Sequence, residues 1–589
     1  MNESQIYYIT KCNSIKLLPQ NSDEKQNLIL LVEEFHVKNF LVKSGYNKVF
    51  YIDDFITCEL AEKYNVLAHS LSIDWSKDDE CQDILKIDGI GIGEIFYWHF
   101  MQKIFVPFFK FFLAALKIIE IYKVKKIFID TDFLNYVKIF ELLNIEYEVF
   151  NNEPDDSVEY EYLVGKKYQY VSPDELLAVP VADFTKKIYF AVRTVFNYAN
   201  FLNAKRRNIL VSSYYPTKPV IKKLLLNFNN VIYFIDEIYA QPYEFNIKSV
   251  IDIDDLKIKL AAPFFRKKFI FEGIDCSDYF MCQIIRFVFD NKNKIEDAFC
   301  RVSSFINNNS IALFFAAVDG SWLNKIAVKI CQMLKIPTVV LANGIICDNY
   351  QNEAKRCDFN ITYSSSIKKD YYKNARNAVV IGNPYFDQYA RFKMKKILPK
   401  KTYKVFICPV TYSPNAINCS KHLEDEYLFD ILKTLAFYNM NKKTLAIYIK
   451  PHPASSIEYL KYFLKYYKFH DIQIVNGRFG DVIKKADLYI SNWSTSNFEA
   501  AALGIPVIYY KKDKMIFHKP FDGDSEMPAA RNQSELKKLI DLFLEKPCNL
   551  SLFCNREILE KYMGPLDGYN VERVYSFLEK VLKMHDNKK

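Results

Sequence analysis

The chain is poor in glycine and its cysteines follow no regular spacing. Only 15 of its 589 residues are glycine, and its 13 cysteines form no C-x-x-C pair. An odd number of scattered cysteines argues against a disulfide framework and indicates a reducing compartment. The first 14 residues, MNESQIYYITKCNS, show no signal-peptide pattern. We therefore expect a cytoplasmic protein.

The sequence also lacks a dense basic run and an uninterrupted hydrophobic segment. The net charge of +9 is spread along the chain, which suits a nucleotide and predicts no nucleic-acid partner. The most apolar stretch, FVPFFKFFLAALKIIEIY (Phe105–Tyr122), is interrupted by Lys110, Lys117 and Glu120. These charges argue against a spanning helix and favour a buried amphipathic helix. Peripheral association with the inner face of the cytoplasmic membrane is the alternative.

What the sequence does contain is an alternation of short apolar runs and helical patterns, which predicts α/β domains with parallel sheets. A chain of 589 residues needs two or three domains. We predict an N-terminal α/β accessory or acceptor domain (1–200), a Rossmann-like domain (201–395), and a second Rossmann-like domain with a final helix (396–589). A basic segment at 390–404 is the predicted linker between the last two.

Apolar runs identify the strands of each predicted domain. The first domain has KVFYIDD (Lys48–Asp54) and KKIFIDTD (Lys125–Asp132); the second has RRNILVSS, NVIYFID, IALFFAAVDG and IPTVVLANG; the third has VFICPVTYS, TLAIYIKPHP, IQIVNG, LYISNWS and IPVIYYK. Two consecutive sheets of this kind enclose a cleft, and ligands bind beyond the carboxyl ends of their strands. The side chains that follow each strand are therefore the candidates for chemistry.

The first candidate follows the predicted strand TLAIYIK. In Lys450-Pro451-His452-Pro453 two prolines fix the backbone around one histidine and remove two amide donors. A lone histidine is usually structural, but one held in this way at a strand end is oriented toward a ligand. It can donate to a phosphate oxygen or act as an acid on a leaving phosphate, because the ordinary pKa of histidine lies near neutrality.

The second candidate follows the predicted strand LYIS. Ser494, Thr495 and Ser496 lie where a helix is expected to begin, and hydroxyls combined with a helix N-terminus form an anion site. Simple N-capping is the alternative. Glu499 either completes a capping box or holds two ribose hydroxyls. Because this loop and the His-Pro loop belong to nearby strands of one sheet, we favour a phosphate site made by both.

The second domain offers two further candidates. Asp319 ends the strand ALFFAAV and is either a general base for an acceptor hydroxyl or a helix cap. Asn343 ends the next strand and can only position a substrate. GIGIGE (Gly89–Glu94) lacks the G-x-G-x-x-G spacing and is predicted as a loop before a helix. Asp130–Asp132 (DTD) lies outside the two sheets, and we expect no metal there.

Several stretches of the chain resemble a known family of enzymes. VDGSW, IPTVVLANG, GNPYFD (Gly382–Asp387), KPHP, SNWSTSNFEAAALGIPVI and YMGPLDG are similar, in this order, to motifs of bacterial surface-carbohydrate glycosyltransferases of the GT-B type. That group includes sialyltransferases, capsule Kdo transferases and polyol-phosphate polymerases of teichoic acid synthesis. The similarity extends over about residues 310–568. It implies two Rossmann-type domains that face a cleft, whereas the N-terminal α/β domain lies outside the similarity.

The resemblance assigns roles to the candidate residues. Lys450, His452 and Pro453, together with the loop Ser494–Ser496, would bind the phosphate of a nucleotide-sugar donor. Glu499 would contact the ribose. His452 and, as acceptor base, Asp319 would be the catalytic residues.

The resemblance also implies a reaction. We expect transfer of a sugar, with a CMP-linked sialic-acid-like or Kdo-like sugar as the leading donor, to a surface glycan, lipid-linked or protein acceptor, with no metal and no cofactor. Many relatives carry Gln-His-Gly where this chain has Ala342-Asn343-Gly344, which disfavours a CDP-polyol phosphotransferase. A UDP-sugar transferase, a sugar-nucleotide 2-epimerase and a non-catalytic glycan-assembly protein stay open as alternatives.

Overall fold

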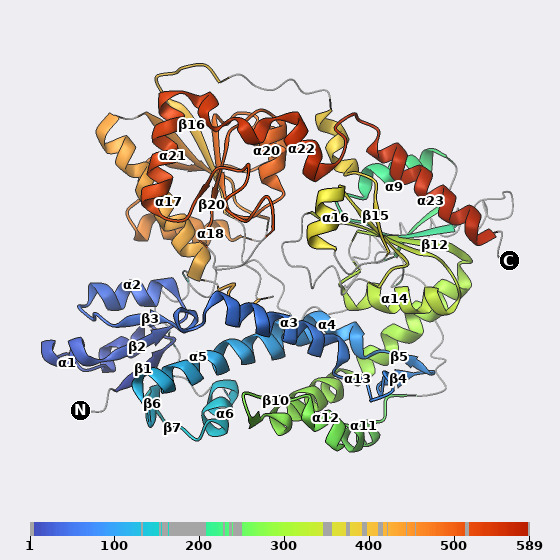
Figure 1. Cartoon of the computed structure of the whole chain (residues 1–589), viewed down its shortest axis with the longest axis horizontal. Helices are drawn as coiled ribbons and strands as arrows, with labels where there is room; N and C mark the ends of the chain where they lie inside the picture. The colour runs from blue at the N-terminus through green and yellow to red at the C-terminus, as the bar shows by residue number, and fades with distance from the viewer. Residues whose placement is uncertain are drawn as a thin grey trace.

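A computed structural model describes residues 5–130, 134–151, 153, 155, 163, 208–227, 230–234, 238, 250–317, 319–344, 356–372, 377–390, 397–409, 416–420, 422–442, 444–453, 455–512 and 518–586. Within these ranges the chain forms three parallel β-sheets, each covered by helices (Figure 1). The predicted α/β fold, with two Rossmann-type sheets and an additional N-terminal α/β unit, is confirmed. The sheets define three units, called here the N-terminal, second and third units.

The sheet of the N-terminal unit has five parallel strands in the order β3-β2-β1-β6-β7. Its strands are β1 (Ile6–Ile9), β2 (Ile29–Val32), β3 (Val49–Tyr51), β6 (Lys126–Ile129) and β7 (Glu146–Val149). Its helices are α1 (Ser22–Asn27), α2 (Phe35–Lys43), α3 (Cys58–Asp74), α4 (Tyr97–His99), α5 (Val106–Tyr122) and α6 (Leu134–Leu142), and β4 (Lys86–Ile87) forms a hairpin with β5 (Ile90–Gly91). The two strands expected here are β3 and β6; β1, β2 and β7 were not predicted.

Helix α5 carries the most apolar stretch of the chain. Phe108 and Phe109 are buried, and their rings lie 4.6 Å from Phe280 and 4.8 Å from Phe271, measured between centroids. The buried amphipathic helix expected at this position is therefore confirmed. No helix within the described residues is both long enough and apolar enough to cross a membrane.

The second unit has a six-stranded sheet in the order β15-β14-β13-β12-β8-β9. Its strands are β8 (Asn208–Ser212), β9 (Asn230–Tyr233), β12 (Ile311–Ala316), β13 (Thr338–Leu341), β14 (Phe359–Thr362) and β15 (Ala378–Val380). Its helices are α9 (Lys218–Leu226), α11 (Ile253–Leu260), α12 (Pro263–Lys267), α13 (Ser277–Asn308), α14 (Trp322–Met333) and α16 (Ser365–Tyr371), with a hairpin of β10 (Ile270–Phe271) and β11 (Ile274–Asp275). The four expected strands form, and β14 and β15 were not predicted.

The N-terminal unit and the second unit share one hydrophobic core. Buried residues of α3 and α5 belong to the same cluster as buried residues of α13, α14 and β12. The long helix α13 connects the two units, and its Phe287 ring lies 5.2 Å from that of Phe96. A shared core of this kind holds two sheets together far more firmly than polar contacts do. The boundary expected near residue 200 falls outside the described residues.

The third unit has a six-stranded sheet in the order β18-β17-β16-β19-β20-β21. Its strands are β16 (Tyr403–Cys408), β17 (Leu445–Ile449), β18 (Ile472–Ile474), β19 (Leu488–Ser491), β20 (Val507–Tyr510) and β21 (Ala529–Ala530). Its helices are α17 (His422–Lys442), α18 (Ile457–Tyr466), α19 (Phe479–Ile483), α20 (Ser496–Ala502), α21 (Gln533–Glu545) and α22 (Arg556–Met563). All five expected strands form. Only the two-residue strand β21 was not predicted.

The chain crosses between the second and third units twice, and the two crossings touch. The first follows β15 and includes Gly382, and the second includes Gly564 at the end of α22. Gly564 has a φ of +80°, and a Cβ at this position would lie 2.5 Å from the carbonyl oxygen of Tyr363 and 2.7 Å from the Cα of Gly382. The backbone N–H of Asn383 donates to the carbonyl of Met563 at 3.0 Å. The GNPYFD and YMGPLDG motifs therefore meet in space.

The final helix, α23 (Asn570–Asp586), starts directly after the second crossing. The carboxylate of Asp387, in the first crossing, accepts hydrogen bonds from the backbone nitrogens of Asn570 at 3.0 Å and Val571 at 2.8 Å. This carboxylate satisfies the open amides of the helix start. The buried face of α23 packs into the core of the second sheet through Val574, Leu578, Val581 and Leu582. The helix that the sequence assigned to the third unit thus lies on the second (Figure 1).

Replacement of Gly564 tests the contact between the crossings. We expect Gly564→Ala to lower the free energy of unfolding by about 2–4 kcal/mol, because it adds positive-φ strain to a clash with backbone atoms. The midpoint of urea unfolding, followed by tryptophan fluorescence, measures the change. Gly480→Ala is the matched control, since its Cβ would meet only the Tyr389 hydroxyl at 3.6 Å. An unchanged midpoint in Gly564→Ala would contradict the close approach.

Candidate functional site

The two loops that carry the expected phosphate-binding residues leave the third sheet at the same edge. Strands β17 and β19 pair with β16 on its two sides, and all three run parallel. His452 lies three residues after Ile449, the end of β17, and Ser494 lies three residues after Ser491, the end of β19. The strand order reverses between β16 and β19, which is where open α/β sheets bind their ligands. The structure therefore brings the His-Pro and Ser-Thr-Ser loops to one edge.

His452 is half-buried in its loop. Burial, with a smaller contribution from Lys450, lowers the pKa of the imidazole below its ordinary value, so the ring is neutral at pH 7. The Lys450 side chain folds back and its Nζ donates to the carbonyl of Pro451 at 2.8 Å. Pro453 is exposed. A neutral imidazole has one N–H to donate, so His452 can bind a phosphate oxygen without adding a charge of its own.

Three hydroxyl groups form a chain at the start of α20. The Oγ of Ser496 lies 2.7 Å from the Oγ of Ser494 and 2.6 Å from the hydroxyl of Tyr489. Thr495 precedes the helix, and its side chain makes no capping hydrogen bond to the described turn. The Oγ of Ser494, however, accepts a hydrogen bond from the backbone nitrogen of Ser496 at 3.2 Å, so capping accounts for part of the cluster and phosphate binding stays a prediction. Because α20 has only seven residues, the hydroxyls contribute more to any anion site than the helix dipole does.

Glu499 lies on the same short helix, and its side chain is 9% exposed. Burial raises the pKa of this carboxyl to about 7, against the lowering effect of hydrogen bonds from Tyr389 and Tyr385. The hydroxyl of Tyr389 donates to Oε2 at 2.6 Å. Both tyrosines belong to the 3-10 helix η7 (Pro384–Tyr389) in the first crossing. Tyrosines thus contact the carboxyl that was expected to hold ribose hydroxyls, and ribose binding stays a prediction.

The second sheet faces the hydroxyl loop from the opposite side. Gly344 follows β13 with a φ of +86°, and a Cβ there would lie 2.7 Å from Oγ1 of Thr495. The N–H of Gly344 donates to the hydroxyl of Tyr363 at 2.8 Å, and that hydroxyl donates to the carbonyl of Ala342 at 2.6 Å. Asn343 lies half-buried between them. We call the loops 342–344 and 494–496, together with η7, the inter-sheet junction.

Asp319 lies at the end of β12 and is 2% exposed. Its Oδ2 accepts a hydrogen bond from the backbone nitrogen of Arg356 at 2.9 Å. Lys325, in the first turn of α14, is buried beside it; burial lowers the pKa of this amine, and Asp319 opposes that effect. The capping residue of α14 is Ser321, whose Oγ accepts from the backbone nitrogen of Asn324 at 3.3 Å. Asp319 is therefore not the cap, and its role as base stays a prediction.

The sequence analysis did not identify the tyrosines of the junction. Tyr385 lies inside the GNPYFD motif, and Tyr389 follows four residues later at the end of the same 3-10 helix. Tyr215, from the loop after β8, lies 5.1 Å from Tyr385 between ring centroids. No local pattern in the sequence indicates the contact of Tyr389 with Glu499, which lies over 100 residues away.

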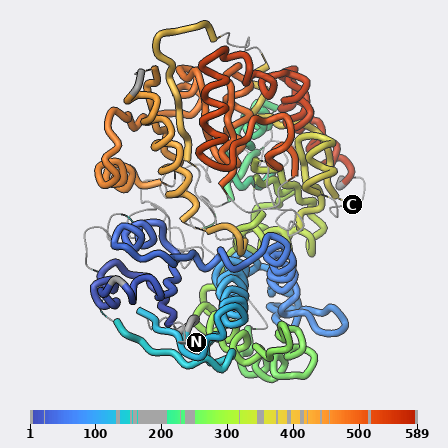
Figure 2. Tube along the Cα trace, turned by 60° about the vertical axis from the view of Figure 1, so that its left-hand side comes forward, coloured from blue at the N-terminus to red at the C-terminus, as the bar shows by residue number. Residues whose placement is uncertain are grey.

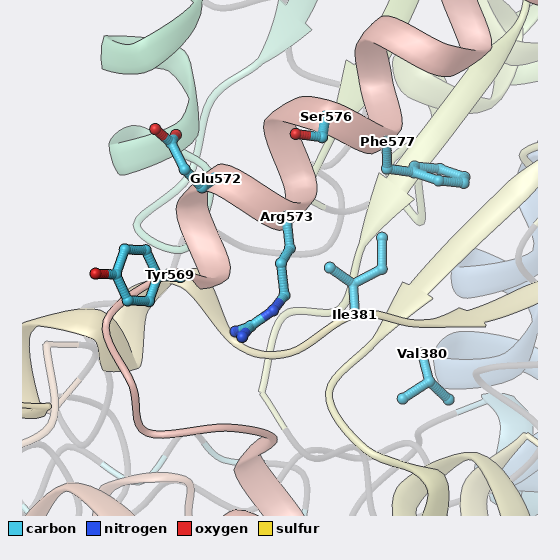
Figure 3. A pocket seen from close by; sticks show the side chains of 7 residues that line it. All are labelled: Val380, Ile381, Tyr569, Glu572, Arg573, Ser576 and Phe577. Carbon is cyan, nitrogen blue, oxygen red and sulfur yellow. The ribbon is translucent and has the colours of Figure 1, made fainter.

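A pocket of about 440 Å³ lies away from these residues, where β15 and its following loop meet the start of α23 (Figure 3). It is lined by Val380, Ile381, Tyr569, Glu572, Arg573, Ser576 and Phe577. Its charged groups are engaged, since Glu572 pairs with Lys223 at 2.6 Å and Arg573 pairs with Asp567. None of the predicted site residues lines it. The pocket is therefore not our candidate site.

Among the described residues, no group of three His, Cys, Asp or Glu side chains is arranged to hold a metal ion. In the DTD stretch, Thr131 and Asp132 lie outside the described residues. Asp130 accepts hydrogen bonds at 2.9 Å from the backbone nitrogens of Thr10 and Lys11, which belong to the loop after β1. That carboxylate therefore completes the loop of its own sheet.

Comparison with known proteins gives similarity at the level of architecture. No protein-family model and no curated sequence matches the chain. Among solved structures, UDP-bound MnaA from S. aureus is 10% identical, covers 64% of this chain and 97% of its own, and has a TM-score of 0.40. The UDP-GlcNAc 2-epimerase from Methanocaldococcus jannaschii is 13% identical, covers 64% of this chain and 99% of its own, and has a TM-score of 0.38. The wall teichoic acid polymerase TagF is 11% identical, covers 68% of this chain and 99% of its own, and has a TM-score of 0.36. Similarity this distant carries no argument about activity.

The raised pKa of Glu499 predicts a pH-dependent stability. A carboxyl with a folded-state pKa of about 7 stabilises the fold below its ordinary pKa, and this contribution is lost as the pH rises through 7. We expect Glu499→Gln to gain up to about 3 kcal/mol relative to wild type between pH 5 and pH 8. Urea unfolding of both proteins across this range measures the difference.

A matched substitution separates this effect from loss of a surface charge. Glu458→Gln removes an exposed carboxyl from the same unit and should follow wild type at every pH. If the Glu499→Gln and wild-type proteins keep a constant difference from pH 5 to pH 8, the carboxyl does not titrate near neutrality in the folded protein.

Proposed function

We propose that the protein is a glycosyltransferase that uses a nucleotide-sugar donor. The observation that carries this proposal is the convergence of the His452 loop and the Ser494–Ser496 loop on either side of β16, opposite Gly344 of the second sheet. Donors of this class carry a phosphate that needs hydrogen-bond donors, and these loops supply an imidazole and three hydroxyl-bearing side chains. The second sheet then presents the acceptor from the opposite side.

The proposed reaction uses the residues on both sides of the junction. An acceptor hydroxyl transfers its proton to the carboxylate of Asp319 as its oxygen bonds to the anomeric carbon of the sugar. The bond from that carbon to the phosphate oxygen breaks, and the electron pair leaves with the nucleotide. The N–H of His452 and the hydroxyls of Ser494 and Ser496 stabilise the negative charge where it develops. Asp319 is buried in this structure, so the acceptor must displace a neighbouring group to reach it.

The donor that we propose is a CMP-linked acid sugar. This choice rests on the resemblance of the KPHP and Ser-Thr-Ser motifs to those of sialyl- and Kdo-transferases. Asn343, which has no proton-accepting nitrogen, argues against a polyol phosphotransferase. A surface glycan, a lipid-linked glycan or a protein would be the acceptor, and the reaction would need no metal ion.

Nucleotide binding is the direct test. We expect CMP to bind more tightly than CDP, UDP or GDP, and His452→Ala to weaken CMP binding by about 10- to 100-fold, because a hydrogen bond to a charged phosphate is lost. Ser496→Ala should weaken it by about tenfold. Isothermal titration calorimetry with each nucleotide measures these constants.

His470→Ala is the control, because this histidine lies exposed in the same unit. It should bind CMP as wild type does. Tighter binding of UDP than of CMP would contradict the CMP-linked donor. It would favour a UDP-sugar transferase or a sugar-nucleotide 2-epimerase instead. If His452→Ala left the affinity for CMP unchanged, the phosphate of the nucleotide would not bind at this edge of the sheet. No binding of any nucleotide would overturn the proposed function and leave a non-catalytic assembly protein.

A further inference from the structure

The N-terminal unit contacts both of the other units near the ends of their central strands. Asn65, buried on α3, accepts a hydrogen bond from the backbone nitrogen of Ile417 at 2.8 Å and donates to Oδ1 of Asn418 at 3.2 Å, in the third unit. Trp98, on α4, contacts Gly320 at the end of β12 in the second unit. Figures 1 and 2 both place the N-terminal helices below the third unit. Helices α3 and α4 thus reach the carboxyl edges of both sheets.

The indole of Trp98 lies beside the turn that carries the proposed base. Its edge sits so close to Gly320 that any Cβ at this glycine would overlap the ring nitrogen Nε1. The side chain is only half-buried. No described residue accepts a hydrogen bond from Nε1, and this nitrogen is not among the buried side-chain atoms that lack a partner. The half-buried indole therefore offers its N–H as a donor beside Gly320, the residue after Asp319.

Ion pairs fix the segment that carries Trp98. Glu94, just before α4, pairs with Lys329 at 2.6 Å and with Nε of Arg356 at 3.0 Å. These cations lower the pKa of its carboxyl to about 2 even though burial opposes them. The backbone nitrogen of Arg356 in turn donates to Asp319. One chain of contacts therefore positions the N-terminal segment relative to the strand end of the second sheet.

We propose that Trp98 is the acceptor-binding platform of the enzyme, and that the acceptor is a glycan whose terminal sugar stacks on the indole and accepts a hydrogen bond from Nε1. This inference rests on the proposed function. A pyranose ring has an apolar C–H face, which packs on an aromatic ring, and hydroxyl groups at its edge, which accept hydrogen bonds. Trp98 offers both contacts. A sugar held there would direct a hydroxyl toward the Asp319–Gly320 turn.

Fluorine NMR of protein labelled with 5-fluorotryptophan tests this placement without an activity assay. The chain has only 4 tryptophans, so each signal can be assigned by substitution. Trp493 lies next to Ser494 and reports on the nucleotide site, whereas Trp98 reports on the proposed acceptor site. The probes are CMP, UDP and a set of methyl glycosides of hexoses, N-acetylhexosamines and sialic acid at high concentration.

We expect nucleotides to shift the Trp493 signal and at least one glycoside to shift the Trp98 signal. If no nucleotide shifts Trp493 or binds by calorimetry, the proposed function fails. If nucleotides bind but no glycoside moves the Trp98 signal, the acceptor platform is overturned while the nucleotide site stands. A glycoside that shifts the signals of other tryptophans but not that of Trp98 would also overturn the acceptor platform.

Substitutions test the role of Trp98 in transfer with the donor and acceptor that these experiments select. Trp98→Phe removes the N–H and should raise the acceptor KM about tenfold with little change in kcat or in nucleotide affinity. Gly320→Ala displaces the indole and should raise the acceptor KM by at least as much. Phe289→Ala, which removes a 67%-exposed aromatic ring from α13, is the control. An unchanged acceptor KM in Trp98→Phe, with folding intact by circular dichroism, would contradict the proposal.

Discussion

The close approach of Gly382 and Gly564 is the constraint on which the junction depends. The lack of a Cβ at Gly564 lets the two crossings pass backbone against backbone, since a Cβ there would lie 2.7 Å from the Cα of Gly382. A Cβ at Gly382 would overlap Oδ1 of Asn570, at the start of α23. The same crossing sets Asp387 at the start of α23, and so returns the last helix to the second sheet. The first crossing also contains the 3-10 helix η7. Two glycines therefore fix how the second and third sheets face each other.

The geometry of the crossing explains the electrostatic state of Glu499. Helix η7 emerges from the first crossing and points Tyr389 at this carboxyl; burial raises the pKa of the carboxyl to about 7, and the hydrogen bond from Tyr389 opposes that rise. A neutral carboxyl at this point avoids an uncompensated negative charge close to a loop that we propose for phosphate. Ribose hydroxyls could replace the tyrosine hydroxyls as hydrogen-bond partners. Structural and binding roles for Glu499 are therefore compatible.

The sequence predicted the elements that carry strong local patterns. Every strand expected in the second and third units forms, because those strands are apolar runs, and all of them except the edge strand β18 contain buried residues. Strand β14 was missed since it buries Asn360 and Thr362, and its pairing with β15 depends partly on the distant Asn377. The His-Pro and Ser-Thr-Ser loops were found because proline and hydroxyl clusters are local signals. Trp98 was not, since only the tertiary fold brings it to Gly320.

The N-terminal unit packs against both of the other units. Its interface with the second unit is a continuous hydrophobic core. Its interface with the third unit combines polar contacts, such as Ser420 with Asp53 at 3.0 Å, with apolar ones. Phe35 belongs to the core of the third sheet, and the ring of Tyr51 stacks on that of His422 at 3.6 Å between centroids. A hydrogen bond contributes only about 1 kcal/mol net, whereas breaking a shared core exposes many apolar side chains. Apolar contacts therefore secure the N-terminal unit on both sides and hold Trp98 against the turn of Asp319 and Gly320.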